Sequence, residues 1–167
     1  MKSMEPTVLG RLYREHAPAL RLYARQWGGS GEDLVQEAFV RLAQQTPPPE
    51  QILPWLYRVV RNAALMAQRT AARRRQREQR VSRPEAWFTT AEDRLDGVEA
   101  TRMLGELPLE LREVIVARLW GGLTFEDIAH LVGCSLPTAH RRYQMGLAQL
   151  RERLEGSWIN TPTAPKI

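Results

Sequence analysis

TFEDIAHLVGCSLPTAHRRY, residues 124–143, is the stretch that decides the fold of the C-terminal part of this 167-residue chain. Thr124 and Asp127 have the spacing of a capping box at the start of a helix. Gly133 can take the positive φ of a tight turn, and Ser135 can cap a second helix. The stretch therefore predicts a helix-turn-helix, the motif that places its second helix in the major groove of DNA.

The second helix of this motif has one apolar and one polar side. Ala139, Tyr143, Leu147 and Leu150 recur at helical spacing and are expected to face inward. The polar side carries the residues that we expect to face solvent or a DNA duplex: His140, Arg141, Arg142 and Gln144.

The composition favours an anionic partner, and the lack of catalytic motifs predicts a protein that is not an enzyme. The net charge is +5 and the pI is near 10.0. The single cysteine, Cys134, excludes a disulfide framework and a cysteine-based metal site. The three histidines are far apart and show no metal-ligand spacing, so we predict no metal site and no cofactor. No catalytic motif is visible. No apolar run has the length of a membrane span and no signal peptide is visible, so we expect a cytoplasmic protein without membrane insertion.

The rest of the chain also has helical periodicity. A first amphipathic helix is predicted over 9–27, and Ser30 with Asp33 indicates the start of a second. Prolines 47–49 must form a loop. A third helix is predicted from about Pro54 into an arginine cluster that ends at Arg80. Its apolar stripe comprises Ile52, Trp55, Leu56, Val59, Val60, Ala63, Met66 and Ala67.

These patterns predict an all-α protein of two small helical domains on a flexible linker, the second domain containing the helix-turn-helix. The first domain is expected over 1–80 and the second over 97–155. Between them, 81–96 loses the periodicity and is acidic, which is typical of a linker. A disordered tail is expected over 156–167.

Two helical surfaces are candidate contact sites. Asp33, Gln36 and Glu37 share the outward face of the second helix, which is either an ordinary solvated face or a docking face for a protein. The third helix carries polar residues that can bind phosphates and base edges opposite its apolar stripe. They are Arg58, Arg61, Asn62 and Arg69, followed by an arginine run that includes Arg73.

Two aromatic residues of the third helix are candidates for stacking on unpaired bases. Trp55 fits the apolar stripe, which favours a packing role. Tyr57 is open to either interpretation.

Three segments, in this order, resemble the extracytoplasmic-function (ECF) group of bacterial sigma factors. EDLVQEAF (32–39) is similar to the helix of region 2 that docks on the polymerase clamp, and WLYRVVRNAA (55–64) to the promoter-melting helix. LPLELREV (107–114), followed by the helix-turn-helix, resembles region 4. The loop 44–53 is shorter and richer in proline than is usual in the family.

The resemblance implies core RNA polymerase and promoter DNA as partners, with an anti-sigma factor as the usual control. Polymerase binding would fall to Asp33, Gln36 and Glu37. Contact with the −10 element would fall to Arg58, Arg61, Asn62, Arg69 and Arg73, and −35 recognition to His140, Arg141, Arg142 and Gln144. The residues leave two alternatives open: a stand-alone helix-turn-helix regulator, and a sigma-like adaptor that binds polymerase without initiating transcription.

Overall fold

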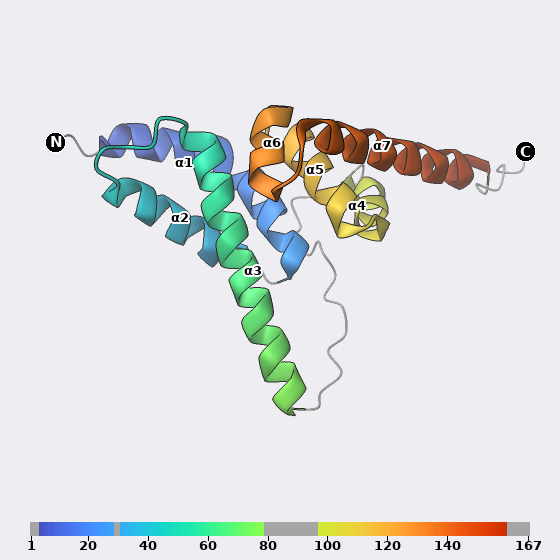
Figure 1. Ribbon diagram of the computed structural model, residues 1–167, viewed down its shortest axis with the longest axis horizontal. Coiled ribbons are helices and arrows are strands. Elements are labelled where there is room, and N and C mark those ends of the chain that lie inside the picture. The colour runs from blue at the N-terminus through green and yellow to red at the C-terminus, as the bar shows by residue number, and fades with distance from the viewer. Residues whose placement is uncertain (1–3, 29–30, 79–96, 160–167) are drawn as a thin grey trace, which may run out of the picture.

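The computed structural model describes residues 4–28, 31–78 and 97–159, and this part of the chain is helical without a strand (Figure 1). This confirms the all-α prediction. The elements are α1 (Pro6–Ala24), the 3-10 turn η1 (Arg25–Trp27), α2 (Glu32–Gln44), α3 (Ile52–Glu78), α4 (Gly97–Glu106), α5 (Leu109–Leu119), α6 (Phe125–Val132) and α7 (Leu136–Ile159).

The helices α1, α2 and α3 pack around an apolar core, as their periodicity predicts. The first predicted helix is present, but its last turn tightens into η1 and ends at Gly28, which has φ 95°. Ser30 lies outside the described residues, and Gly31 with φ 70° is the residue that precedes α2. The largest fully buried side chains of this part are Leu20, Tyr23, Val35, Leu42, Leu56, Tyr57 and Val60.

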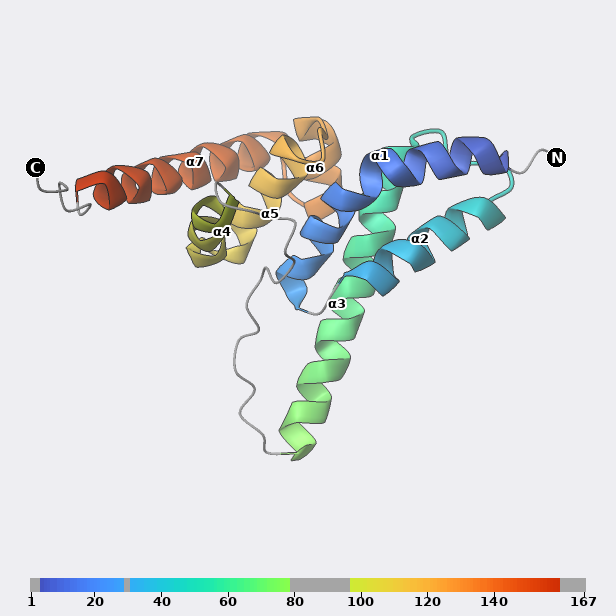
Figure 2. The same ribbon diagram turned by 180° about the vertical axis from the view of Figure 1, so that it is seen from behind.

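The α3 helix is longer than the surface it packs against. It begins at Ile52, two residues before the predicted start, and its apolar stripe is buried only as far as Ala64. The prediction that Met66 and Ala67 belong to the packed stripe is wrong, since Met66 is 71% exposed and Ala67 is exposed. The C-terminal end of α3 projects away from the neighbouring helices (Figures 1 and 2).

The C-terminal helices confirm the local signals of the helix-turn-helix. Thr124 and Asp127 form a complete capping box at the start of α6, and Gly133 takes φ 73° at its end. The Ser135 hydroxyl accepts a hydrogen bond from the backbone N–H of Thr138 at 3.3 Å, capping α7. The α7 helix runs to Ile159, so the first residues of the predicted tail are helical.

One apolar cluster joins the N-terminal helices (α1–α3) to the C-terminal helices (α4–α7). Tyr23 and Tyr57 pack in the same cluster as Val114 and Ala117 of α5 and Ile128 of α6. The predicted linker, 81–96, lies outside the described residues. The two predicted domains therefore pack directly on each other in this structure.

Candidate functional site

The predicted docking face of α2 is an exposed polar surface. Asp33, Gln36 and Glu37 are all exposed, and Asp33 lies about one helical turn before the adjacent pair Gln36 and Glu37. Glu37 accepts a hydrogen bond from Arg41 Nε at 2.8 Å, four residues further along. The face thus carries two carboxylates and an amide that a partner can reach.

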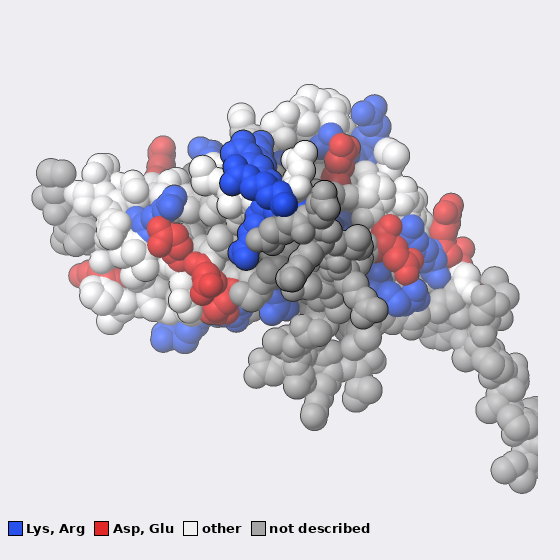
Figure 3. Space-filling model, turned by 90° about the horizontal axis from the view of Figure 1, so that it is seen from below, with Lys and Arg blue, Asp and Glu red and all other residues white. Residues whose placement is uncertain are grey.

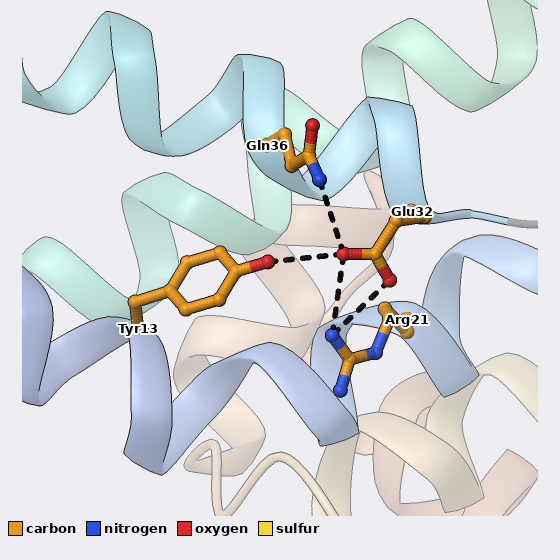
Figure 4. A network of polar contacts seen from close by, with 4 residues as sticks. All are labelled: Tyr13, Arg21, Glu32 and Gln36. Carbon is orange, nitrogen blue, oxygen red and sulfur yellow. Dashed lines mark hydrogen bonds and ion pairs between the residues drawn. The ribbon is translucent and has the colours of Figure 1, made fainter.

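Glu32, which the sequence did not single out, organises the start of this face (Figure 4). Its Oε1 accepts hydrogen bonds from the Tyr13 hydroxyl at 3.0 Å and from Gln36 Nε2 at 3.3 Å, and its carboxylate pairs with Arg21 at 3.1 Å. Burial opposes ionisation of this carboxyl, but the bonds from Tyr13 and the charge of Arg21 outweigh it and lower its pKa. The network ties α2 to α1 and orients Gln36.

The predicted −10 residues of α3 separate into two groups. Arg58, Asn62, Arg69 and Arg73 are exposed at intervals of four and seven residues, which places them along one side of the helix. Arg61 points elsewhere: its side chain is 21% exposed, and its Nε donates to Glu113 of α5 at 2.6 Å. Burial alone would lower the Arg61 pKa, but the bond to Glu113 outweighs it and the pKa is raised.

The two candidate stacking residues both pack against the apolar core. Tyr57 is fully buried, with its ring edge-on to Tyr23 at 4.9 Å between centroids, and burial raises its pKa. Trp55 is partly buried against the same core. The stacking interpretation of Tyr57 is therefore wrong for this arrangement of the chain, because no base can reach its ring.

A groove of about 780 Å³ between α2 and α3 brings the first two candidate surfaces side by side. Glu37 and Arg41 line it from α2, and Asn62, Met66 and Arg74 line it from α3. Figure 3 shows this juxtaposition of charge, with basic side chains near the middle of the face and acidic ones beside them toward α1 and α2. A partner that binds the α2 face would border directly on the polar side of α3.

The predicted −35 residues of α7 also differ in their surroundings. Arg141 and Gln144 are exposed. The His140 ring is exposed but lies on the Phe125 ring, with centroids 3.8 Å apart. Arg142 turns toward α5, where it pairs with Glu110 at 3.4 Å and keeps a side-chain exposure of 26%.

Among residues 4–28, 31–78 and 97–159 there is no group of three or more potential metal ligands. Within the same residues, none of the helices has the length and apolar character needed to cross a membrane.

Two family models match the chain, one in the N-terminal helices and the other in the C-terminal helices. Sigma-70 region 2 matches residues 12–75, which run from the middle of α1 to near the end of α3. Sigma-70 region 4 matches residues 98–150, which cover α4 to most of α7. Together the two matches span most of the chain.

Individual relatives agree with these matches. The chain is 32% identical to the ECF RNA polymerase sigma factor SigE of Mycolicibacterium smegmatis, over 86% of this chain but 60% of the relative's length. It is 28% identical to the RNA polymerase sigma factor CarQ of Myxococcus xanthus, over 86% of this chain and 87% of CarQ.

Solved structures share the fold. The sigma factor RpoE from Bartonella quintana, crystallised in complex with the anti-sigma factor NepR, superimposes with a TM-score of 0.75 at 25% identity. That match covers 89% of this chain and 98% of RpoE. CnrH, solved in complex with the cytosolic domain of CnrY, has the same fold with a TM-score of 0.61 at 24% identity, over 91% of this chain and 90% of CnrH. The chain therefore belongs to the ECF group of the sigma-70 family, with region 2 in its N-terminal helices and region 4 in its C-terminal helices.

Proposed function

We propose that this chain binds core RNA polymerase, recognises the −10 and −35 elements of a promoter and directs transcription initiation, without catalytic activity of its own. The observation that carries the proposal is the presence of three exposed surfaces on one sigma-family chain: the polar face of α2, the Arg–Asn stripe of α3 and the outward side of α7. We assign residues 1–80 and 97–155 to the two functional domains, 81–96 to the linker and 156–167 to a tail.

Each surface has a role that suits its chemistry. The carboxylates and amide of Asp33, Gln36 and Glu37 suit a basic protein surface, so we assign them to polymerase docking. The stripe of Arg58, Asn62, Arg69 and Arg73 suits an opening DNA strand, because guanidinium and amide groups bind phosphates and base edges. Arg61 joins this set only when it leaves Glu113.

The −35 element falls to α7. Arg141 and Gln144 project from the helix that follows the tight turn, as a recognition helix requires, and His140 extends the same surface. Arg142 contributes when its pairing with Glu110 is exchanged for a phosphate. An anti-sigma factor, of the kind that the RpoE complex contains, is the partner that we propose for control.

Reconstitution with sigma-free core polymerase tests the proposal. The complex should give run-off transcripts from promoters upstream of the gene's own operon. Asp33→Ala and Gln36→Ala should weaken binding to core polymerase and leave binding to −35 duplex DNA unchanged, while Arg141→Ala should do the reverse. Absence of core binding would contradict the proposal, and core binding without initiation would favour the adaptor alternative.

A further inference from the structure

The side chain of Glu113 is buried between the two halves of the molecule. It lies on α5 with 5% exposure, yet its hydrogen-bond partners belong to the N-terminal helices. Tyr23 of α1 donates to Oε1 at 2.6 Å, and Arg61 Nε of α3 donates to the same oxygen at 2.6 Å. Burial of a carboxylate is unfavourable unless it is paired. Burial of Glu113 is therefore favourable only while α5 packs against α1 and α3, because these helices supply its two hydrogen-bond partners.

Close contacts around Glu113 extend this interface. Gly121, which follows α5, lies against Tyr57 of α3, since an added Cβ would be 2.7 Å from the Tyr57 hydroxyl. Arg112 of α5 donates to the backbone carbonyl of Gln26 in η1 at 3.3 Å. These contacts join the same two sets of helices as the ion pair of Glu113 and Arg61, in which Glu113 is 5% exposed.

The ion pair occupies a residue that the proposed function gives to DNA. Arg61 lies on α3 next to Asn62, which is exposed, but its guanidinium faces α5. A carboxylate and a phosphate offer the same kind of anionic oxygen to a guanidinium group. While Glu113 holds Arg61 Nε, the Arg61 side chain is only 21% exposed, so a DNA strand on α3 must compete with the carboxylate for this guanidinium.

We propose that Glu113 is a built-in competitor for the promoter strand: in the closed chain it holds Arg61, and the −10 strand gains Arg61 only when α5 leaves α1 and α3. This inference rests on the proposed DNA role of Arg61. Strand binding and interdomain packing then exclude each other at one side chain. The apparent affinity of the free chain for the strand is lowered in proportion to the fraction that is closed.

Glu113→Gln in the full chain tests this competition. The variant keeps the size of the side chain and removes the charge that holds Arg61. We expect a larger radius of gyration by small-angle X-ray scattering, because the halves separate more often. Binding of a random-sequence single-stranded dodecanucleotide, measured by fluorescence anisotropy, should tighten about tenfold if the wild-type chain is open about a tenth of the time.

Two further variants keep the test decisive. Tyr23→Phe retains the buried ring and removes the second hydrogen bond to Glu113, so it should shift both measurements in the same direction by a smaller factor. Glu126→Gln removes an exposed carboxylate of α6 and should leave the radius of gyration and the affinity unchanged. Circular dichroism should show wild-type helix content in all three variants.

Two results would overturn the competition. One is an unchanged radius of gyration in both Glu113→Gln and Tyr23→Phe. The other is expansion without tighter binding of the oligonucleotide. Adding Arg61→Gln to Glu113→Gln separates this from the proposed function: if the double variant binds the strand as well as Glu113→Gln alone, Arg61 is not a DNA contact, whatever the scattering shows.

Discussion

Gly146 of α7 lies directly on Ile115 of α5, because a Cβ added at position 146 would be 2.4 Å from Ile115 Cδ1. Ile115 is fully buried, so a shift of its side chain would press on other closely packed core side chains. Gly146→Val should therefore lower the free energy of unfolding by about 1–3 kcal/mol through overpacking, measured by urea denaturation.

Gly156, on the same helix, is the matched control for this prediction. An added Cβ there would meet no atom within 4 Å. Gly156→Val makes the same change in helix propensity without a clash, so its effect should stay within about 0.5 kcal/mol. Equal losses at both positions would contradict the close approach of α5 and α7.

The Glu32 network should make stability depend on pH. Because the Glu32 pKa is lowered in the folded chain from its ordinary 4.5, the unfolded chain binds this proton first as the pH falls. The contribution of Glu32 is therefore complete above about pH 4.5 and disappears as the pH falls through the folded-state pKa. Glu32→Gln should be less stable than wild type at neutral pH, by at most about 1 kcal/mol for so exposed a pair.

Urea denaturation at a series of pH values measures the difference between wild type and Glu32→Gln. The difference should shrink as the pH is lowered below about 4.5. Glu126→Gln, at an exposed position on α6, is measured beside them as a control for the loss of one surface carboxylate. A gap between wild type and Glu32→Gln that stays constant at acidic pH would disprove the role given to the ionised carboxylate.

The two buried tyrosines should respond differently to loss of their hydroxyl groups. Tyr57 has no hydrogen-bond partner for its hydroxyl among the described residues, whereas Tyr23 donates to Glu113. Tyr57→Phe should leave the free energy of unfolding unchanged or raise it slightly, since an unpaired buried hydroxyl is unfavourable. Tyr23→Phe should lower it by about 1–3 kcal/mol. Thermal and urea denaturation of the pair measure the contrast, and equal effects would refute it.

The two neighbouring arginines of α7 should contribute unequally to −35 binding. Arg141 is exposed, whereas Arg142 is paired with Glu110. Arg141→Gln should reduce affinity for −35 duplex DNA and lower the slope of log affinity against log salt by about 1. Arg142→Gln should change both quantities less, because a phosphate must first displace Glu110. Anisotropy titrations at several KCl concentrations measure both, and equal slopes would argue against the distinction.

The sequence predicts the helix caps and the tight turn, because these features depend on residues close together in the chain. The cap at Thr124, the turn at Gly133 and the cap at Ser135 each depend on partners within four residues, and all three are present. The outward face of α2 followed from helical periodicity in the same way. The roles of these surfaces in binding polymerase and DNA stay predictions.

Contacts between distant residues could not be predicted from the sequence. Glu113 bonds to residues that are 52 and 90 positions away in the sequence. The residues next to it in α5 give no signal that its side chain is buried. Periodicity also cannot show where α3 extends past its neighbours, so it predicts a packed Met66 although this side chain is exposed. Helical spacing gives the apolar side of a helix but not the length over which another element covers it.

The uncovered end of α3 makes its helical order depend on solution conditions. Arg69, Arg73 and Arg77 follow one another at four-residue intervals, all exposed, so their like charges repel along the helix. No core packing compensates there, and an isolated helical end of this kind is marginal in water. An anionic strand laid along these residues would relieve the repulsion and lengthen the ordered helix. Under the proposed function, folding of this end of α3 and binding of the DNA strand are thermodynamically linked, so that salt, temperature and DNA would all act on the same helix–coil equilibrium.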